Sequence, residues 1–137
     1  MRLHHALIMV CVFAASGFKP AAAHEFVDNA KVTPLMSQVL AGMPGKVGSM
    51  LVVEYPPGGK TDKHRHPGAH TFVYVLDGEL EFQVAGKDAV KLGPGQTYYE
   101  SPADIHAVSR NVSATKPARF LVVFVQDEGK APVEPVE

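Results

Sequence analysis

Cysteine and tryptophan are almost absent from this sequence: it has one cysteine, Cys11, and no tryptophan among 137 residues. Cys11 lies in an N-terminal apolar run, residues 6–18, which follows a short basic start and precedes three alanines at positions 21–23. This order is typical of a secretory signal peptide, so we predict that residues 1–23 are removed. The remaining chain then has no cysteine, which excludes disulfides, thiolate metal ligands and a cysteine nucleophile. Its core must be held by packing, together with any bound metal.

Long apolar runs and an excess of basic charge are also lacking. Residues 6–18 fall short of the roughly 20 apolar residues that span a bilayer, which argues against the alternative of an uncleaved membrane anchor. The chain has 13 basic and 14 acidic residues, for a formal net charge of −1, and no clustered basic surface of the kind that binds nucleic acid. We therefore expect a periplasmic or secreted protein whose partners include neither nucleic acid nor, after cleavage, a membrane.

From Val47 onward, short apolar runs rich in Val, Phe and Tyr alternate with turn residues, which predicts one all-β domain. Asp77-Gly78 is typical of a two-residue hairpin, so the runs on either side of it are expected to be antiparallel neighbours. Residues 120–125 are apolar on both faces, as expected for a strand between two sheets or under a partner subunit. A homodimer is the expected assembly.

The segments around this domain give further expectations. Residues 24–46 are interpreted as an N-terminal arm, in which residues 34–45 have apolar positions at helical spacing and form either a short helix or an arm against the barrel or a second subunit. Residues 47–126 are predicted to form the barrel. Residues 127–137 are polar and rich in proline, which predicts a flexible tail.

Histidines give the chain its candidate site. His64 and His66 are two residues apart, so on a strand both imidazoles point to one side, as half of a metal site would require. His106 lies far along the chain, in another short strand after a proline-containing turn. In a closed all-β fold that strand can supply the facing ligand.

These residues resemble the motifs of the cupins. The first motif, Gly, His-x-His, Glu and Gly at set spacings, is matched by Gly58, His64, His66, Thr71 and Gly78. The second is matched more loosely, by Gly95, Pro102, Asp104, His106 and Asn111. The resemblance covers about residues 47–126 and implies a double-stranded β-helix, or jelly roll, with a metal inside one end of the barrel. It also implies that Thr71 stands where the family has a glutamate ligand.

The sequence therefore does not identify the fourth ligand of the metal. On a regular strand His70 points away from Thr71 and the metal, but a bulge after the turn at residues 67–69 could re-aim it, so His70 stays a candidate ligand. Glu100 alternates in phase with Tyr98 and either enters the barrel, as a ligand or general base, or is a solvated carboxylate. Tyr98 is a candidate for binding a ligand in the pocket.

Imidazole ligands suit iron, copper, nickel and zinc, and manganese is a further candidate, so the divalent metal is not identified by the sequence. Two functional classes remain open. The first is a metalloenzyme that acts on a small anionic or enolisable molecule by dioxygenase-like, isomerase-like or decarboxylase-like chemistry. The second is a non-catalytic protein that binds a metal or a small ligand as a sensor, carrier or scaffold.

Overall fold

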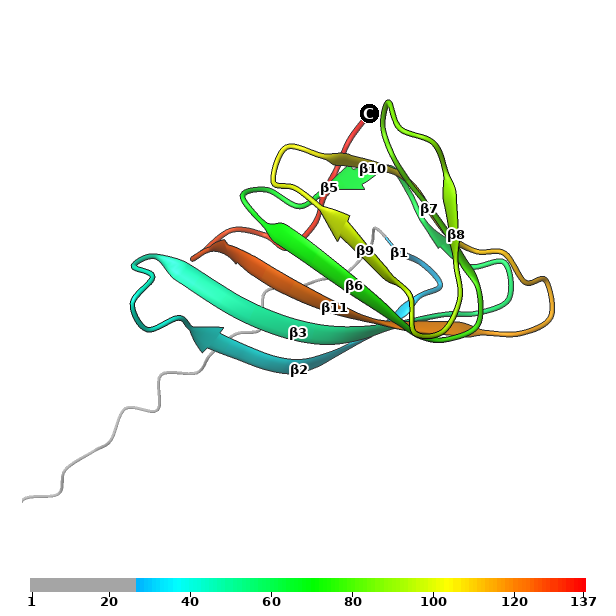
Figure 1. Ribbon diagram of the computed structural model, residues 1–137, viewed down its shortest axis with the longest axis horizontal. Coiled ribbons are helices and arrows are strands. Elements are labelled where there is room, and N and C mark those ends of the chain that lie inside the picture. The colour runs from blue at the N-terminus through cyan, green and yellow to red at the C-terminus, as the bar shows by residue number, and fades with distance from the viewer. Residues whose placement is uncertain (1–26) are drawn as a thin grey trace, which may run out of the picture.

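The computed structural model describes residues 27–137 as two antiparallel sheets that face each other (Figure 1). The five-stranded sheet has the order β2, β3, β11, β6, β9, with bounds Lys31–Val39, Lys46–Tyr55, Ala118–Asp127, His70–Asp77 and Thr97–Glu100. The seven-stranded sheet has the order β1, β4, β10, β5, β12, with bounds Val27–Asp28, Lys60–Thr61, Ile105–Asn111, His64–Arg65 and Glu134–Pro135. Its other two strands are β7 (Leu80–Val84), which pairs with β10, and β8 (Val90–Leu92), which pairs with β7.

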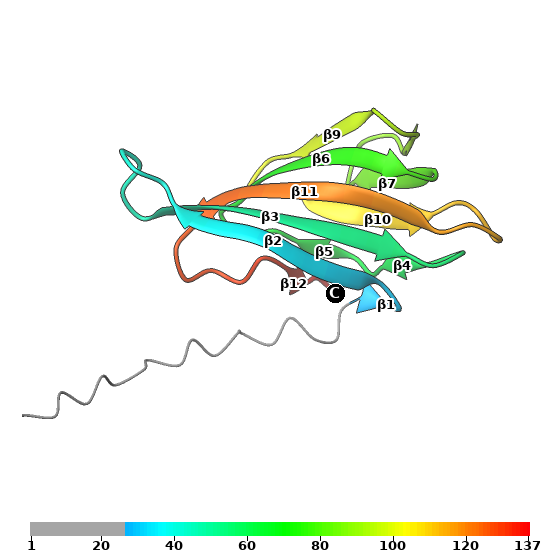
Figure 2. The same cartoon turned by 90° about the horizontal axis from the view of Figure 1, so that it is seen from below.

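The core lies between the two sheets because alternate residues of each long strand point inward. In β11 the inward residues Phe120, Val122 and Phe124 are buried, and in β7 Leu80 and Phe82 are fully buried. Figure 2 shows β10, β5 and β7 behind the long strands of the five-stranded sheet. This arrangement confirms the predicted all-β double-stranded β-helix. No helix among residues 27–137 is long and apolar enough to cross a membrane.

The turn at Asp77-Gly78 has a different role from the one the sequence predicts. Strands β6 and β7 are not neighbours: β6 pairs with β11 and β9, whereas β7 pairs with β10 and β8. The prediction of a paired hairpin is wrong because the turn carries the chain from one sheet to the other. Gly78 has φ of 79°, and a Cβ there would lie 2.6 Å from that of Ala118, so the corner requires glycine.

The segment before residue 47 is part of both sheets. β2 pairs along its length with β3, so the helical alternative for residues 34–45 is wrong. Residues 40–45 form the turn between these strands, and Pro34 adjoins a register shift in β2, where a missing N–H is tolerated. The signal-peptide prediction for residues 1–23 lies outside the described residues.

The C-terminal segment also differs from the prediction of a flexible tail. β12 pairs with β5 through Glu134 opposite Arg65 and Pro135 opposite His64. Arg65 reinforces this pairing through an ion pair with Glu134 at 2.8 Å. Strand β5 has an otherwise open edge on this side, and its unpaired backbone groups explain why a polar, proline-containing segment is held there.

Candidate metal centre

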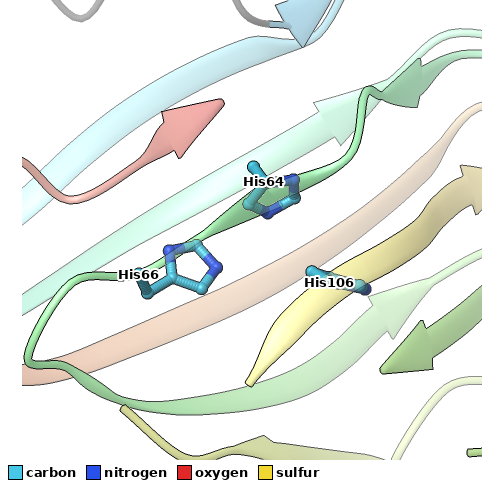
Figure 3. A group of neighbouring side chains, drawn as sticks. All are labelled: His64, His66 and His106. Carbon is cyan, nitrogen blue, oxygen red and sulfur yellow. The ribbon is translucent and has the colours of Figure 1, made fainter. Parts of the chain in front are cut away.

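His64, His66 and His106 come together at one end of the space between the sheets (Figure 3). β5 and β10 are antiparallel neighbours in which His64 lies opposite His106, and His66 follows β5 on the same side as His64. The three side chains are buried, with exposed fractions of 5%, 7% and 3% respectively. Their potential ligand atoms all lie within 4.8 Å of one another, so these residues could hold a metal ion.

Backbone carbonyls orient two of the rings. The Nδ1 of His64 lies 2.6 Å from the carbonyl oxygen of Asp62, and the Nδ1 of His66 lies 2.6 Å from that of Pro132. A carbonyl oxygen only accepts hydrogen bonds, so each Nδ1 carries the proton and each Nε2 keeps its lone pair. This is how metal-binding histidines are commonly held, with the second nitrogen donating to a fixed acceptor.

Burial favours the neutral form of His64 and His66. It lowers the pKa of His64 from 6.5 to about 4, with a further lowering from the neighbouring His106. Burial also lowers the pKa of His66, although the charge of Glu100 and the hydrogen bond to Pro132 partly oppose that change. Since a metal binds only the neutral form, the fold removes much of the competition between metal and proton.

Glu100, at the end of β9, lies beside the three histidines with an exposed fraction of 2%. Its Oε2 is 3.2 Å from the Nδ1 of His106 and 3.8 Å from the Nε2 of His66. Neither contact has hydrogen-bond geometry, and Oε2 has no hydrogen-bond partner. Although burial raises the pKa of this carboxyl, the nearby His106 and the other imidazoles lower it further, to a value below the ordinary one. Glu100 is therefore an ionised carboxylate inside the barrel, as one of the two alternatives expected.

His70 is directed away from the cluster. It is exposed, its Nδ1 lies 2.8 Å from the hydroxyl of Tyr99, and the two rings stack with centroids 6.1 Å apart. Thr71, the next residue, is buried on the inner face. The bulge that could have re-aimed His70 is absent, because β6 pairs in regular register with β11 and β9 at this position. The structure thus keeps His70, a candidate ligand from the sequence, outside the group formed by His64, His66 and His106.

Aromatic side chains surround the histidines. Phe82 packs edge-on against His106 with ring centroids 4.8 Å apart, and Phe124 lies 5.0 Å from His66. Tyr98 stacks on His106 at 6.3 Å, is half-buried, and has a pKa raised by burial. A groove of about 570 Å³ lies outside this cluster, lined by Phe72, Val73, Tyr74, Thr97, Tyr98, Tyr99, Leu121 and Val123.

The donor set fits a divalent transition metal. Nε2 of His106, Oε2 of Glu100 and Oγ1 of Thr71 are buried without hydrogen-bond partners, and unpartnered buried polar atoms are rare in folded proteins. Neutral imidazoles and a carboxylate are ordinary ligands of such metals. Sequence reasoning did not find the supporting carbonyls of Asp62 and Pro132, because every residue has a carbonyl and only the fold shows which ones face a histidine.

This chain is similar in sequence to one family of known proteins. The model of the Cupin domain family matches residues 51–124. Germin-like protein subfamily 2 member 4 of Arabidopsis thaliana is 30% identical over 115 residues, which make up 82% of this chain and 51% of that protein. This chain therefore spans about half the length of that relative.

Solved structures extend the likeness to the fold. An oxalate oxidase in complex with the substrate analogue glycolate matches with a TM-score of 0.62 and 25% identity, over 80% of this chain and 56% of that one. The DMSP lyase DddQ from Ruegeria pomeroyi matches with a TM-score of 0.56 and 26% identity, over 65% of this chain and 43% of that one.

Proposed function

The chain belongs to the cupin family, and we propose that it is a secreted metalloenzyme that acts on a small anionic or enolisable molecule at a histidine-bound divalent metal. The observation that carries this proposal is the burial of His64, His66 and His106 with their potential ligand atoms within 4.8 Å of one another. Imidazoles gathered this closely form a ready set of ligands for a divalent transition metal.

His64, His66 and His106 would hold the metal. A bound divalent ion supplies Lewis acidity and a positive charge that attracts carboxylates and enolates. The carbonyls of Asp62 and Pro132 hold two of the rings in the ligating tautomer, while Phe82 and Phe124 exclude water beside them. Tyr98, which stacks on His106, would border a molecule bound at the metal.

The substrate class is supported by the size and chemistry of the site. Aromatic rings stand directly against His66 and His106, so little space is left for a large molecule. Two structures similar to this chain are, by their names, an oxalate oxidase in complex with glycolate and a DMSP lyase, and oxalate and glycolate are small carboxylates. A metal held by these histidines would supply the Lewis acidity that dioxygenase-like, isomerase-like or decarboxylase-like chemistry on such a molecule uses.

One observation favours a second candidate function, a non-catalytic protein that binds the metal as a sensor, carrier or scaffold. All three histidines are at least 93% covered, and the 570 Å³ groove is not lined by any of them. A metal enclosed in this way would have restricted access for substrate.

Location and assembly belong to the same proposal. The N-terminal pattern, with an apolar run at residues 6–18 followed by three alanines, supports export to the periplasm or beyond. The outer face of the five-stranded sheet exposes Phe72, Tyr74 and Tyr99, which supports a homodimer in which a second copy covers this face.

Metal content tests the proposal. The purified protein should contain close to one equivalent of a transition metal by mass spectrometry, and His64→Ala and His106→Ala should lose it. His70→Ala is the matched control and should retain it, because His70 lies outside the cluster. Absence of metal from the wild-type protein, after incubation with each candidate ion, would contradict the proposal.

Turnover separates the two functions. The metal-loaded protein is incubated with small carboxylic acids such as oxalate and glycolate, and their disappearance is followed by chromatography together with oxygen uptake. Consumption that is lost in His106→Ala supports the enzyme. Stoichiometric metal binding without consumption of any such acid would support the sensor, carrier or scaffold instead.

A further inference from the structure

Glu100 and Thr71 occupy paired positions on neighbouring strands. β6 and β9 are antiparallel, and Thr71 lies directly opposite Glu100 in their register. We propose that Glu100 is the fourth protein ligand of the metal, so that β9 supplies the carboxylate that β6 lacks at Thr71. This inference rests on the metal centre of the proposed function and concerns its ligand set and charge.

Strand geometry places both side chains toward the same point. Residues directly opposite each other in an antiparallel pair project to the same face, with Cβ atoms about 4.5–5.5 Å apart. The exposed fractions of Thr71 and Glu100 are 1% and 2%, so that face is the interior. A glutamate side chain is long enough to span this separation, and its carboxylate can therefore reach the region that a carboxylate at position 71 would occupy.

The observed contacts agree with this placement. Oε2 of Glu100 lies 3.8 Å from the Nε2 of His66, the nitrogen that the Pro132 carbonyl leaves free, and 3.2 Å from the Nδ1 of His106. The same oxygen has no hydrogen-bond partner, nor does Nε2 of His106. A buried carboxylate needs a cationic partner, and a metal ion bound by the histidines would supply one.

A role as general base is less consistent with the same facts. A base must reach a substrate proton, whereas Glu100 reaches two histidines of the cluster itself. As a ligand, the carboxylate reduces the charge of a divalent centre from +2 to +1. An anionic substrate would then be held less strongly than at a purely imidazole site.

The small side chain of Thr71 fits this arrangement. Its Oγ1 is buried without a hydrogen-bond partner, so the hydroxyl is not required by a neighbour. Carboxylates at both positions would be adjacent like charges, which are unfavourable opposite each other on a sheet. We therefore expect a single carboxylate ligand from β6 and β9, supplied either from position 71 or from position 100.

Binding of Co²⁺ tests the assignment without relying on activity. The metal-free protein is titrated with Co²⁺ alone, and the visible absorption of the ion reports both affinity and coordination. Glu100→Gln should weaken binding by about 10- to 100-fold or more, the range found when a group that fixes a metal site is lost, and should alter the spectrum. Glu79→Gln, an exposed glutamate in the turn after β6, is the matched control and should bind as the wild type does.

The transposed variant, Thr71→Glu with Glu100→Thr, provides the rescue. It should recover most of the affinity lost in Glu100→Gln, because the carboxylate returns to the centre from the other strand. Far-UV circular dichroism establishes that each variant is folded, and the transposed variant decides the question if Glu100→Gln alone does not fold.

The outcomes distinguish this inference from the proposed function. Wild-type Co²⁺ affinity and spectrum in Glu100→Gln, with binding lost in His64→Ala, would overturn the ligand role and leave the three-histidine centre in place. Failure of the wild-type protein to bind Co²⁺ or any other candidate ion would overturn both.

Discussion

At the scale of single residues, burial removes water from the histidines of the candidate site and favours the neutral imidazole, which is the form that binds a metal. His64 is covered on all sides, and its imidazole is stabilised in the neutral form by loss of water and by the neighbouring His106. The unfolded chain has no such environment, so its histidines bind protons near the ordinary pKa of about 6.5. The difference between the two states makes the stability of the metal-free fold depend on pH.

We expect metal-free protein to lose stability as the pH falls from about 6.5 to about 4. Over this window the unfolded state binds a proton at His64 and the folded state does not, because the folded pKa is about 4. The loss from this residue is on the order of 3 kcal/mol once the pH is below both values. The lowered pKa of His66 acts in the same direction. Urea unfolding followed at several pH values measures the effect.

Two variants check the origin of this pH dependence. His64→Gln removes one of the two titrating groups and should make the curve less steep between pH 6.5 and 4, with the contribution of His66 remaining. His70→Ala removes an exposed histidine and should leave the curve as it is in the wild type. A stability that does not change over this range in the wild type would contradict the expectation.

The alternation of side chains between the two faces of a strand was the strongest information that the sequence held about the site. Alternation along β5 and β9 correctly placed His64 with His66, and Glu100 with Tyr98, because side chains on a strand change face at every residue. Alternation could not decide between His70 and Thr71, since a bulge of one residue reverses the assignment. It also could not place Glu100 opposite Thr71, because the register between β6 and β9 depends on the folded sheet.

At the scale of elements, the C-terminal segment connects the fold to the site. β12 pairs with β5, the strand that carries His64, and the carbonyl of Pro132 accepts the hydrogen bond from His66. In Figure 1 this red segment runs beside β5 up to the C-terminus. Short as it is, the segment therefore holds one of the three metal-site histidines in its orientation.

Deletion of residues 131–137 should weaken metal binding by about tenfold or more, since loss of the partner that orients a metal-binding histidine typically costs 10–100-fold. The fold should persist, because the deleted strand β12 has two residues and contributes none of the buried core. Competition with a chelator measures the affinity, and circular dichroism measures the fold.

Glu134→Gln is the control for this deletion. It removes the exposed ion pair with Arg65 but keeps the Pro132 carbonyl, and exposed ion pairs contribute little. Its affinity should stay within about twofold of the wild type on that account. Equal affinities for the wild-type and truncated proteins would show that His66 needs no acceptor from this segment.

The elements that the sequence predicted were those with strong patterns of their own. The apolar strands from residue 47 to 126 have the alternation or β-branched content that local reasoning detects. β2 and β12 lack such patterns, since one contains Pro34 and the other Pro135, and both form by pairing with an existing sheet edge. The Asp77-Gly78 turn was found, but its geometry alone does not say whether the flanking strands stay in one sheet.

At the scale of the whole molecule, one face of the five-stranded sheet has no cover within residues 27–137. Phe72, Tyr74 and Tyr99 are exposed by 47%, 45% and 47%, and they border the 570 Å³ groove. The opposite face of the same strands forms the core. A sheet with apolar residues on both faces is expected to have something packed on each.

If a second copy covers this face, as the proposed homodimer requires, Phe72→Glu should convert the dimer to a monomer. A charge at this position cannot be desolvated in an apolar interface, whereas it stays in water in the separate chain. Analytical ultracentrifugation measures the mass over a range of concentrations. Val90→Glu, an equally apolar exposed position on β8 in the other sheet, is the control and should remain dimeric. A monomeric wild-type protein at all concentrations would contradict the dimer, and monomers in both variants would place the interface elsewhere. The thermal midpoint of the wild type should also rise with protein concentration, because association stabilises only the folded state.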